Sequence, residues 1–112
     1  MSTERQRRPP TEYTERWPYG DFEKGDRSVP GDYIARRAAR QVAQVVLAVQ
    51  HARHARGWTQ QDLAEQADTS QKTISEFESG KVWPDLFSVA KACEALDLDL
   101  RAAARHVEDG PT

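Results

Sequence analysis

Apolar residues recur at helical spacing through the middle of the chain. Between Asp32 and Arg56 most of them fall three or four residues apart, and they are Ile34, Ala38, Val42, Val45, Val46, Val49 and Ala52. Such a stripe is typical of an amphipathic helix that packs one face on a core. We therefore predict one long helix, or two joined end to end, with Asp32 as the N-cap.

A shorter helical pattern follows at Thr59. Thr59 and Asp62 form a Thr-x-x-Asp sequence, in which the threonine side chain accepts a hydrogen bond from a free backbone N–H of the first turn. The apolar positions after it lie on one helical face, and they are Leu63, Ala64 and Ala67. This pattern predicts a capped helix of under ten residues.

A second short helix is predicted after a three-residue turn. Asp68-Thr69-Ser70 has turn chemistry, Ser70 can cap the next helix, and Ile74 and Phe77 are its inward positions. Gly80 ends it, as glycine commonly does just beyond a helix. Two capped helices around a tight turn have the size of a helix-turn-helix, which places its second helix in the DNA major groove.

These residues resemble the helix-turn-helix domain of the Cro/phage-repressor (XRE) family. Within the motif the resemblance rests on Gln60, Leu63, Ala64, Ile74 and Phe77. Outside it the resemblance rests on Arg53, the run from Arg56 to Gln60, the run from Glu78 to Lys81, Pro84, and the apolar residues Leu86, Val89, Ala92, Cys93, Leu96, Leu98 and Leu100. Two positions depart, because Asp68 replaces a usual glycine and Trp58 a usual leucine. Asp tolerates left-handed backbone better than most residues.

The resemblance implies an all-α, five-helix, lambda-repressor-like DNA-binding domain. The expected domain covers residues 32–108, with the family match at 45–100, an extended first helix and a fifth helix of Leu100, Ala103, Ala104 and Val107. Residues 109–112 are expected to form a frayed tail. Residues 1–31 are expected to form a disordered N-terminal arm, because Pro and Gly recur there among dense mixed charges.

The resemblance also assigns the residues that contact DNA. The outward side chains of the second motif helix are Gln71, Lys72, Thr73, Ser75 and Glu76. Of these, Gln71, Lys72 and Glu76 match the family's main base-reading positions, and Gln, Lys and Glu suit adenine, guanine and cytosine respectively. Gln60, Ser70 and Lys81 are expected to contact phosphates and hold the register.

A structural ion pair between Arg53 and Glu78 is implied in the same way. In the family, an arginine at the end of the first helix pairs with a glutamate at the end of the recognition helix. The alternative is two independent surface charges.

Charge distribution alters the picture of a DNA-binding protein. The net charge is −2, and from Val45 to Leu100 there are five Lys/Arg against nine Asp/Glu. Because phosphate neutralisation drives non-specific binding, this domain should bind DNA weakly outside its target. Met1 to Gln44 holds nine Lys/Arg against seven Asp/Glu, with a basic face at Arg36, Arg37 and Arg40.

The N-terminal arm leaves three readings open. It is a plain unfolded segment, a protein-docking segment that uses Trp17, Tyr19 and Phe22, or a minor-groove arm that uses Arg5, Arg7 and Arg8. Three interpretations also remain open for the basic face of Arg36, Arg37 and Arg40. It is a solvated face, it contacts DNA phosphate, or it contacts a sister subunit. For Trp83 they are packing on its own loop or contact with the DNA backbone.

Other chemistry lacks support in the sequence. His51 and His54 lie at i, i+3 spacing without a Cys or Asp cluster, so we expect no metal and no cofactor. No nucleophile–base arrangement is present, so we expect a non-enzyme. One cysteine, no membrane-length apolar run and no apolar signal region indicate a cytoplasmic protein.

Two functions of different classes fit the sequence. The first is a sequence-specific transcriptional regulator that binds double-stranded DNA as a homodimer on an inverted repeat. The second is an antitoxin or adaptor of the same fold, whose main role is to bind a protein partner through its arm or basic helix.

Overall fold

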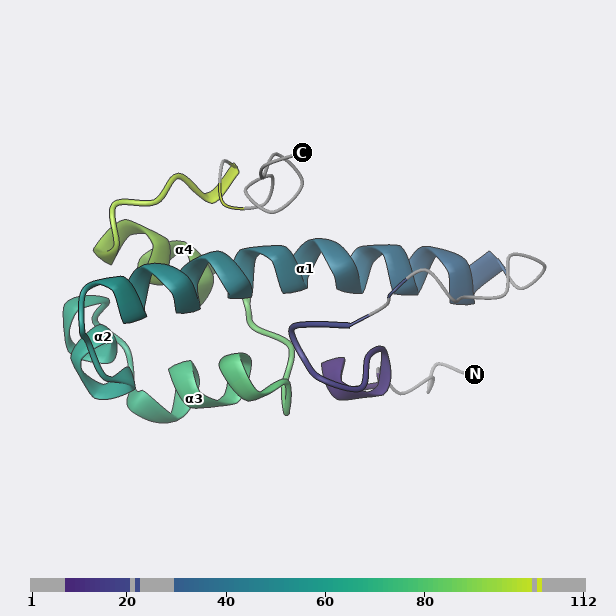
Figure 1. Cartoon of the computed structure of the whole chain (residues 1–112), viewed down its shortest axis with the longest axis horizontal. Helices are drawn as coiled ribbons and strands as arrows, with labels where there is room; N and C mark the ends of the chain where they lie inside the picture. Colours follow the sequence, from purple (N-terminus) through teal and green to yellow (C-terminus); the bar gives the residue numbers. More distant parts are fainter. Residues whose placement is uncertain (1–7, 21, 23–29, 102, 104–112) are drawn as a thin grey trace.

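The computed structural model describes residues 8–20, 22, 30–101 and 103. The described part is helical and has no β-strand. Its elements are a short 3-10 helix η2 (Pro10–Glu12) and four α-helices, α1 (Pro30–Ala55), α2 (Gln60–Gln66), α3 (Gln71–Ser79) and α4 (Leu86–Ala95). Helix α1 is the long axis of the molecule; α2 and α3 lie along one side of its C-terminal half and α4 lies on another (Figure 1).

Local sequence determines where the short helices begin. Thr59 Oγ1 accepts from the backbone N–H of Asp62 at 3.0 Å, and Asp62 Oδ2 accepts from the N–H of Thr59 at 2.9 Å, which completes the capping box. Ser70 Oγ caps α3 by accepting from the N–H of Thr73 at 3.1 Å. The predicted caps of these two short helices are confirmed. The predicted N-cap role of Asp32 is wrong, because α1 already begins at Pro30 and Asp32 lies in its first turn.

Left-handed backbone lies where the sequence predicts it. Asp68, in the turn between α2 and α3, has a φ of 56°, and Gly80 has a φ of 80° directly after α3. Asp68 thus adopts the conformation of the glycine that it replaces, since a short polar side chain is tolerated there.

The main hydrophobic core lies between the C-terminal half of α1 and helices α2 to α4. Val46 and Val49 of α1, Leu63 of α2, and Ile74 and Phe77 of α3 are almost fully buried in it. Val89, Ala92, Cys93 and Leu96 close it from the side of α4. This half of the predicted α1 stripe is confirmed.

The N-terminal half of α1 uses a different face from the predicted one. Ile34 keeps 67% of its surface exposed, and Ala38 is exposed as well. Ala39 and Ala43 are buried instead, in a second cluster with Tyr13 and Phe22. The predicted inward role of Ile34 and Ala38 is therefore wrong, because small alanines on the neighbouring face admit the aromatic rings of the N-terminal segment.

The expected disorder of the N-terminal arm is wrong for residues 8–20 and 22. Pro10, Tyr13 and Phe22 are buried, and Trp17 packs against both clusters. The Trp17 ring contacts Phe22 and Trp83 edge-on, with centroids 6.1 and 5.8 Å apart. Prolines prevented a regular helix, as expected, but they did not prevent packing.

The remaining predictions concern the two ends of the described chain. A fifth helix at 100–107 falls mostly on undescribed residues; Leu100, Arg101 and Ala103 have helical backbone, and the structure has four α-helices rather than the expected five in its described part. Arg5, Arg7 and residues 109–112 also lie outside the described residues. Within the described part, no helix is both long and apolar enough to cross a membrane.

Candidate nucleic-acid interface

Helix α3 is divided into a buried and an exposed face. Ile74 and Phe77 are buried in the main core, while Gln71 and Lys72 in the first turn are exposed. Thr73, Ser75 and Glu76 are half-buried. The first turn of the helix thus presents an amide and an ammonium group outward.

Two of the expected base-reading residues contact each other. Lys72 Nζ lies 3.7 Å from Glu76 Oε2, one turn further along α3. The lysine side chain is 82% exposed and the glutamate side chain 33%. An ion pair this open to water is weak, so either side chain can exchange it for another partner.

Ser70 and Thr73 are already hydrogen-bonded within the protein, whereas Lys81 is exposed to solvent. The Ser70 hydroxyl caps α3 and also lies 2.9 Å from Thr73 Oγ1. Lys81 is exposed just beyond α3, and its backbone N–H donates to the carbonyl of Glu76. The Lys81 side chain is therefore on the surface, next to the end of α3.

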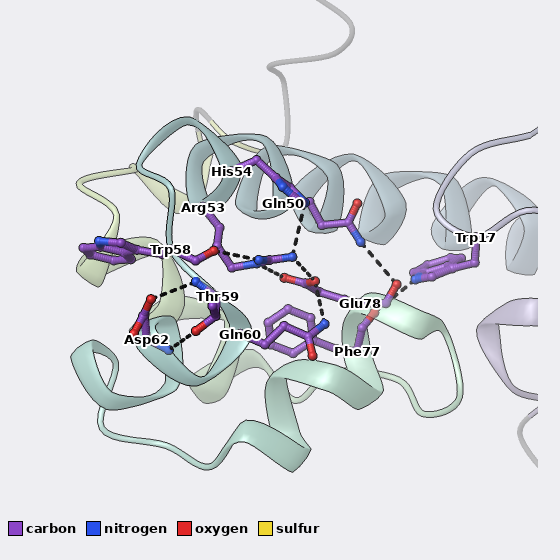
Figure 2. A network of polar contacts seen from close by, with 10 residues as sticks. All are labelled: Trp17, Gln50, Arg53, His54, Trp58, Thr59, Gln60, Asp62, Phe77 and Glu78. Carbon is purple, nitrogen blue, oxygen red and sulfur yellow. Dashed lines mark hydrogen bonds and ion pairs between the residues drawn. The ribbon is translucent and has the colours of Figure 1, made fainter.

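Beneath this surface, Glu78 is the centre of a polar network (Figure 2). Arg53 Nε donates to Glu78 Oε2 at 2.9 Å and Arg53 Nη2 donates to Glu78 Oε1 at 2.8 Å. The side chains are 9% and 4% exposed. Gln60 Nε2, at the start of α2, donates to the same Oε1 at 3.0 Å. One carboxylate thus joins the end of α1 to the start of α2.

The network extends to two backbone carbonyls. Arg53 Nη1 donates to the Trp58 carbonyl at 2.9 Å, which fixes the loop between α1 and α2. Gln50 Nε2 donates to the Glu78 carbonyl at 3.3 Å, at the end of α3. With these bonds and those to Glu78, each nitrogen of the guanidinium has an acceptor, as a buried charge requires.

Gln60 has a second function available within this geometry. It was expected to contact DNA, and its amide already donates one hydrogen to Glu78. A glutamine amide carries two N–H donors, so one remains for a group outside the protein. The buried ion pair therefore orients an expected phosphate-contacting residue.

Sequence reasoning missed the residues that anchor the N-terminal segment at the end of α3. Trp17 Nε1 donates to the Phe77 carbonyl at 3.1 Å, and the Thr11 N–H donates to the Gly80 carbonyl at 3.3 Å. Trp83 Nε1 donates to the Arg8 carbonyl at 2.6 Å. The only sequence signal was the coincidence of aromatic residues in the segment and in the loop after α3. The expected packing of Trp83 on its own loop is therefore corrected: its ring lies against Tyr13 and Trp17 of the N-terminal segment.

The described part offers no arrangement for metal binding or for cysteine chemistry. No group of three or more His, Cys, Asp or Glu side chains there is arranged to hold a metal ion. Burial raises the pKa of the Cys93 thiol to about 11, so the described cysteine is a poor nucleophile.

Comparison with known proteins adds family evidence to this geometry. A family model described as helix-turn-helix matches residues 49–102. One curated relative, Multiprotein-bridging factor 1 from Schizosaccharomyces pombe (strain 972 / ATCC 24843), is 36% identical over 57 residues, which make up 51% of this chain and 38% of that protein. The match thus spans less than half the length of that relative. No solved structure matches the chain. The capped α2–turn–α3 unit agrees with this match, and residues 49–102 fold as a helix-turn-helix domain that is similar to those of the Cro/phage-repressor (XRE) type.

Proposed function

We propose that this protein is a sequence-specific transcriptional regulator that inserts α3 into the DNA major groove as a homodimer on an inverted repeat. The observation that carries the proposal is the division of α3 into a buried apolar face and an exposed first turn with Gln71 and Lys72. In helix-turn-helix proteins this end of the recognition helix contacts the base edges. The helix-turn-helix match and the bridging-factor relative both point to a non-enzymatic regulator.

Base reading is assigned to Gln71, Lys72 and Glu76. The Gln71 amide matches the donor and acceptor of adenine, and the Lys72 ammonium matches the acceptors of guanine. Glu76 accepts from cytosine, and for that it gives up the 3.7 Å contact with Lys72. Thr73 and Ser75 lie on the same helix, and we assign them to the groove wall.

Phosphate contacts are assigned to Gln60, Ser70 and Lys81. Gln60 keeps its bond to Glu78 and donates its second hydrogen to a phosphate, while Lys81 contributes a positive charge beyond the end of α3. Ser70 already caps α3, so its phosphate contact uses the hydroxyl hydrogen.

The net negative charge of the domain predicts how its DNA affinity divides between phosphate contacts and base contacts. With few cations near the groove, few counterions are released on binding, so non-specific affinity and salt dependence are both low. Base contacts then provide a larger share of the DNA affinity than they do in a DNA-binding domain with a net positive charge.

An adaptor or antitoxin role is the second candidate. It is supported by the acidic domain and by the similarity to a protein that is named as a multiprotein-bridging factor. A docking arm with free aromatic residues is disfavoured, because Trp17 and Phe22 are engaged on the protein's own domain. A partner would have to use another surface or displace that packing. In either role we expect the cytoplasm as the compartment.

Selection of bound duplexes from a random DNA pool tests the proposal. We expect enrichment of an inverted repeat whose half-sites lie about one helical turn apart, on the order of 10 base pairs. A pool that stays random after repeated rounds would contradict DNA reading and favour the adaptor role. An enriched single half-site without symmetry would retain DNA reading and contradict the homodimer.

A further inference from the structure

The C-terminal end of α3 is held by side chains from outside the helix. The last four backbone carbonyls of an α-helix have no partner within it, so each needs a donor from elsewhere. The Phe77 carbonyl accepts from Trp17 Nε1 at 3.1 Å, and the Glu78 carbonyl accepts from Gln50 Nε2 at 3.3 Å (Figure 2). The end of α3 is thus bonded both to α1 and to the N-terminal segment.

The loop after α3, from Gly80 to Trp83, is held by the N-terminal segment at both of its ends. The Thr11 N–H donates to the Gly80 carbonyl at 3.3 Å, and a Cβ added at Gly80 would lie 2.7 Å from Trp17 Cγ. At the other end, Trp83 Nε1 donates to the Arg8 carbonyl at 2.6 Å. The rings of Trp17 and Trp83 meet edge-on, with centroids 5.8 Å apart. Trp17 therefore contacts the first and the last residue of the loop.

Lys81 lies between these two anchored residues. It is exposed, as is its neighbour Val82, so burial does not fix the middle of the loop. The Lys81 N–H donates to the Glu76 carbonyl at 3.2 Å, which joins the start of the loop to the last turn of α3. The position of the lysine relative to α3 thus depends on the anchors on either side of it.

We propose that Trp17 is a positioning residue for DNA binding, which holds the loop after α3 so that Lys81 meets the phosphate backbone while α3 lies in the groove. The proposal rests on the proposed function, which assigns Lys81 a phosphate contact. Trp17 acts through the loop and does not itself touch the DNA. A loop that is already ordered in the free protein loses less conformational entropy on binding, so its phosphate contact is stronger.

The charges of the N-terminal segment argue against direct DNA contact as its main role. Its described charged residues are Arg8, Glu12, Glu15 and Arg16, two of each sign, and all four are exposed. Attraction to phosphates requires an excess of positive charge, which these residues do not provide. The segment therefore affects DNA binding through the loop that it holds.

The salt dependence of DNA affinity tests the role of Trp17. Affinity for the selected duplex would be measured from about 50 to 200 mM salt. Lys81→Ala should flatten the plot of log affinity against log salt by about one unit for each bound chain. We expect Trp17→Ala to flatten it similarly and to weaken binding about threefold or more for every duplex. Trp17→Phe keeps a ring but loses the N–H, so it should show a smaller loss and serves if Trp17→Ala does not fold.

A double-mutant cycle separates positioning from other roles. In Lys81→Ala, adding Trp17→Ala should weaken binding by no more than about twofold. In Lys72→Ala, at the other end of α3, the two losses should multiply. Leu96→Ala is the control for lost stability, because Leu96 is buried at the end of α4, and it should leave the salt slope unchanged.

Two results of these measurements would overturn the proposal. If the losses from Trp17→Ala and Lys81→Ala multiply, Trp17 acts on DNA binding independently of the lysine. If folded Trp17→Ala binds with wild-type affinity and salt slope, the segment only stabilises the fold.

A measurement without DNA keeps this proposal distinct from the proposed function. A nitroxide spin label on Lys81→Cys reports the motion of the loop, and Cys93 reacts poorly because it is buried with a pKa of about 11. Trp17→Ala should shorten the rotational correlation time of this label and leave a label on Gln61→Cys, exposed on α2, unchanged. Equal mobility at residue 81 with and without Trp17 would overturn the proposal. A wild type that selects no duplex would instead contradict the proposed function, and the label would then decide whether Trp17 holds the loop.

Discussion

Arg53 and Glu78 form a two-bond ion pair across the interior, with contacts of 2.9 and 2.8 Å, that ties α1 to the end of α3. Their side chains are 9% and 4% exposed, so neither charge can recover its hydration if the other is lost. The same carboxylate orients Gln60. Stability and the shape of the α2–α3 surface therefore depend on one carboxylate.

Removing the Glu78 charge should destabilise the protein strongly. Glu78→Gln leaves Arg53 buried without a counter-charge, and we expect a loss of about 3 kcal/mol in the free energy of unfolding. Asp97→Asn is the control, because it breaks the Arg56–Asp97 pair, whose aspartate is 84% exposed, and asparagine tolerates the left-handed backbone at that position. The control should cost under about 1 kcal/mol in denaturant unfolding. Equal costs for the two variants would contradict a buried pair.

Alanine substitutions at two glycines test the contact between the N-terminal segment and the end of α3. A Cβ at Gly80 would lie 2.7 Å from Trp17 Cγ, whereas a Cβ at Gly57 meets nothing within 4 Å. Both have positive φ, 80° and 71°, so Ala costs a similar backbone strain of about 1 kcal/mol at each. We expect Gly80→Ala to lose roughly 1–2 kcal/mol more of the free energy of unfolding than Gly57→Ala loses. Thermal melting of the two variants measures this difference.

Deleting residues 1–22 should remove that difference and lower the melting temperature. An unstructured arm would leave melting unchanged on deletion, but Trp17 packs on both clusters and donates to the Phe77 carbonyl. We expect the truncated chain to lose about 2 kcal/mol or more, because Trp17, Tyr13 and Phe22 no longer cover Ala39 and Ala43. If the truncated chain melts like the full one, the segment does not pack in solution.

Stability should fall in the alkaline range through Cys93. Its folded pKa is raised from 9.0 to about 11 by burial, so the unfolded chain loses the thiol proton first as pH rises. The sign follows: the contribution is fully present below pH 9 and is lost progressively up to about pH 11. Denaturant titrations across this window should show a steeper decline in the wild type than in Cys93→Ala. Parallel declines would mean that the thiol is accessible to solvent.

The sequence predicted the elements whose signals are local. Thr59–Asp62, Ser70 and Gly80 each act within four residues of the backbone groups that they satisfy, so the bounds of α2 and α3 could be read from the chain. The pairing of Arg53 with Glu78 came through family resemblance, because nothing local links two charges on separate helices.

The N-terminal segment could not be predicted, because its contacts are long-range. Trp17 reaches α3, and Trp83 reaches Arg8, through packing that no short pattern encodes. The same contacts determine which face of the first half of α1 is buried. Because Tyr13 and Phe22 cover Ala39 and Ala43, Ile34 is left exposed. Periodicity identified the helix correctly and its buried face incorrectly.

The central claim is that the first turn of α3 contacts the DNA bases. The most direct test compares how strongly the wild type and Gln71→Ala discriminate between bases. Affinities would be measured for the selected target and for each single-base change in one half-site, with Gln66→Ala on α2 as a control for an exposed glutamine. We predict that Gln71→Ala loses roughly 1–3 kcal/mol of discrimination at one position per half-site, that Lys72→Ala does so at another, and that Gln66→Ala loses none. Wild-type affinity and base preference in both α3 variants would contradict the claim.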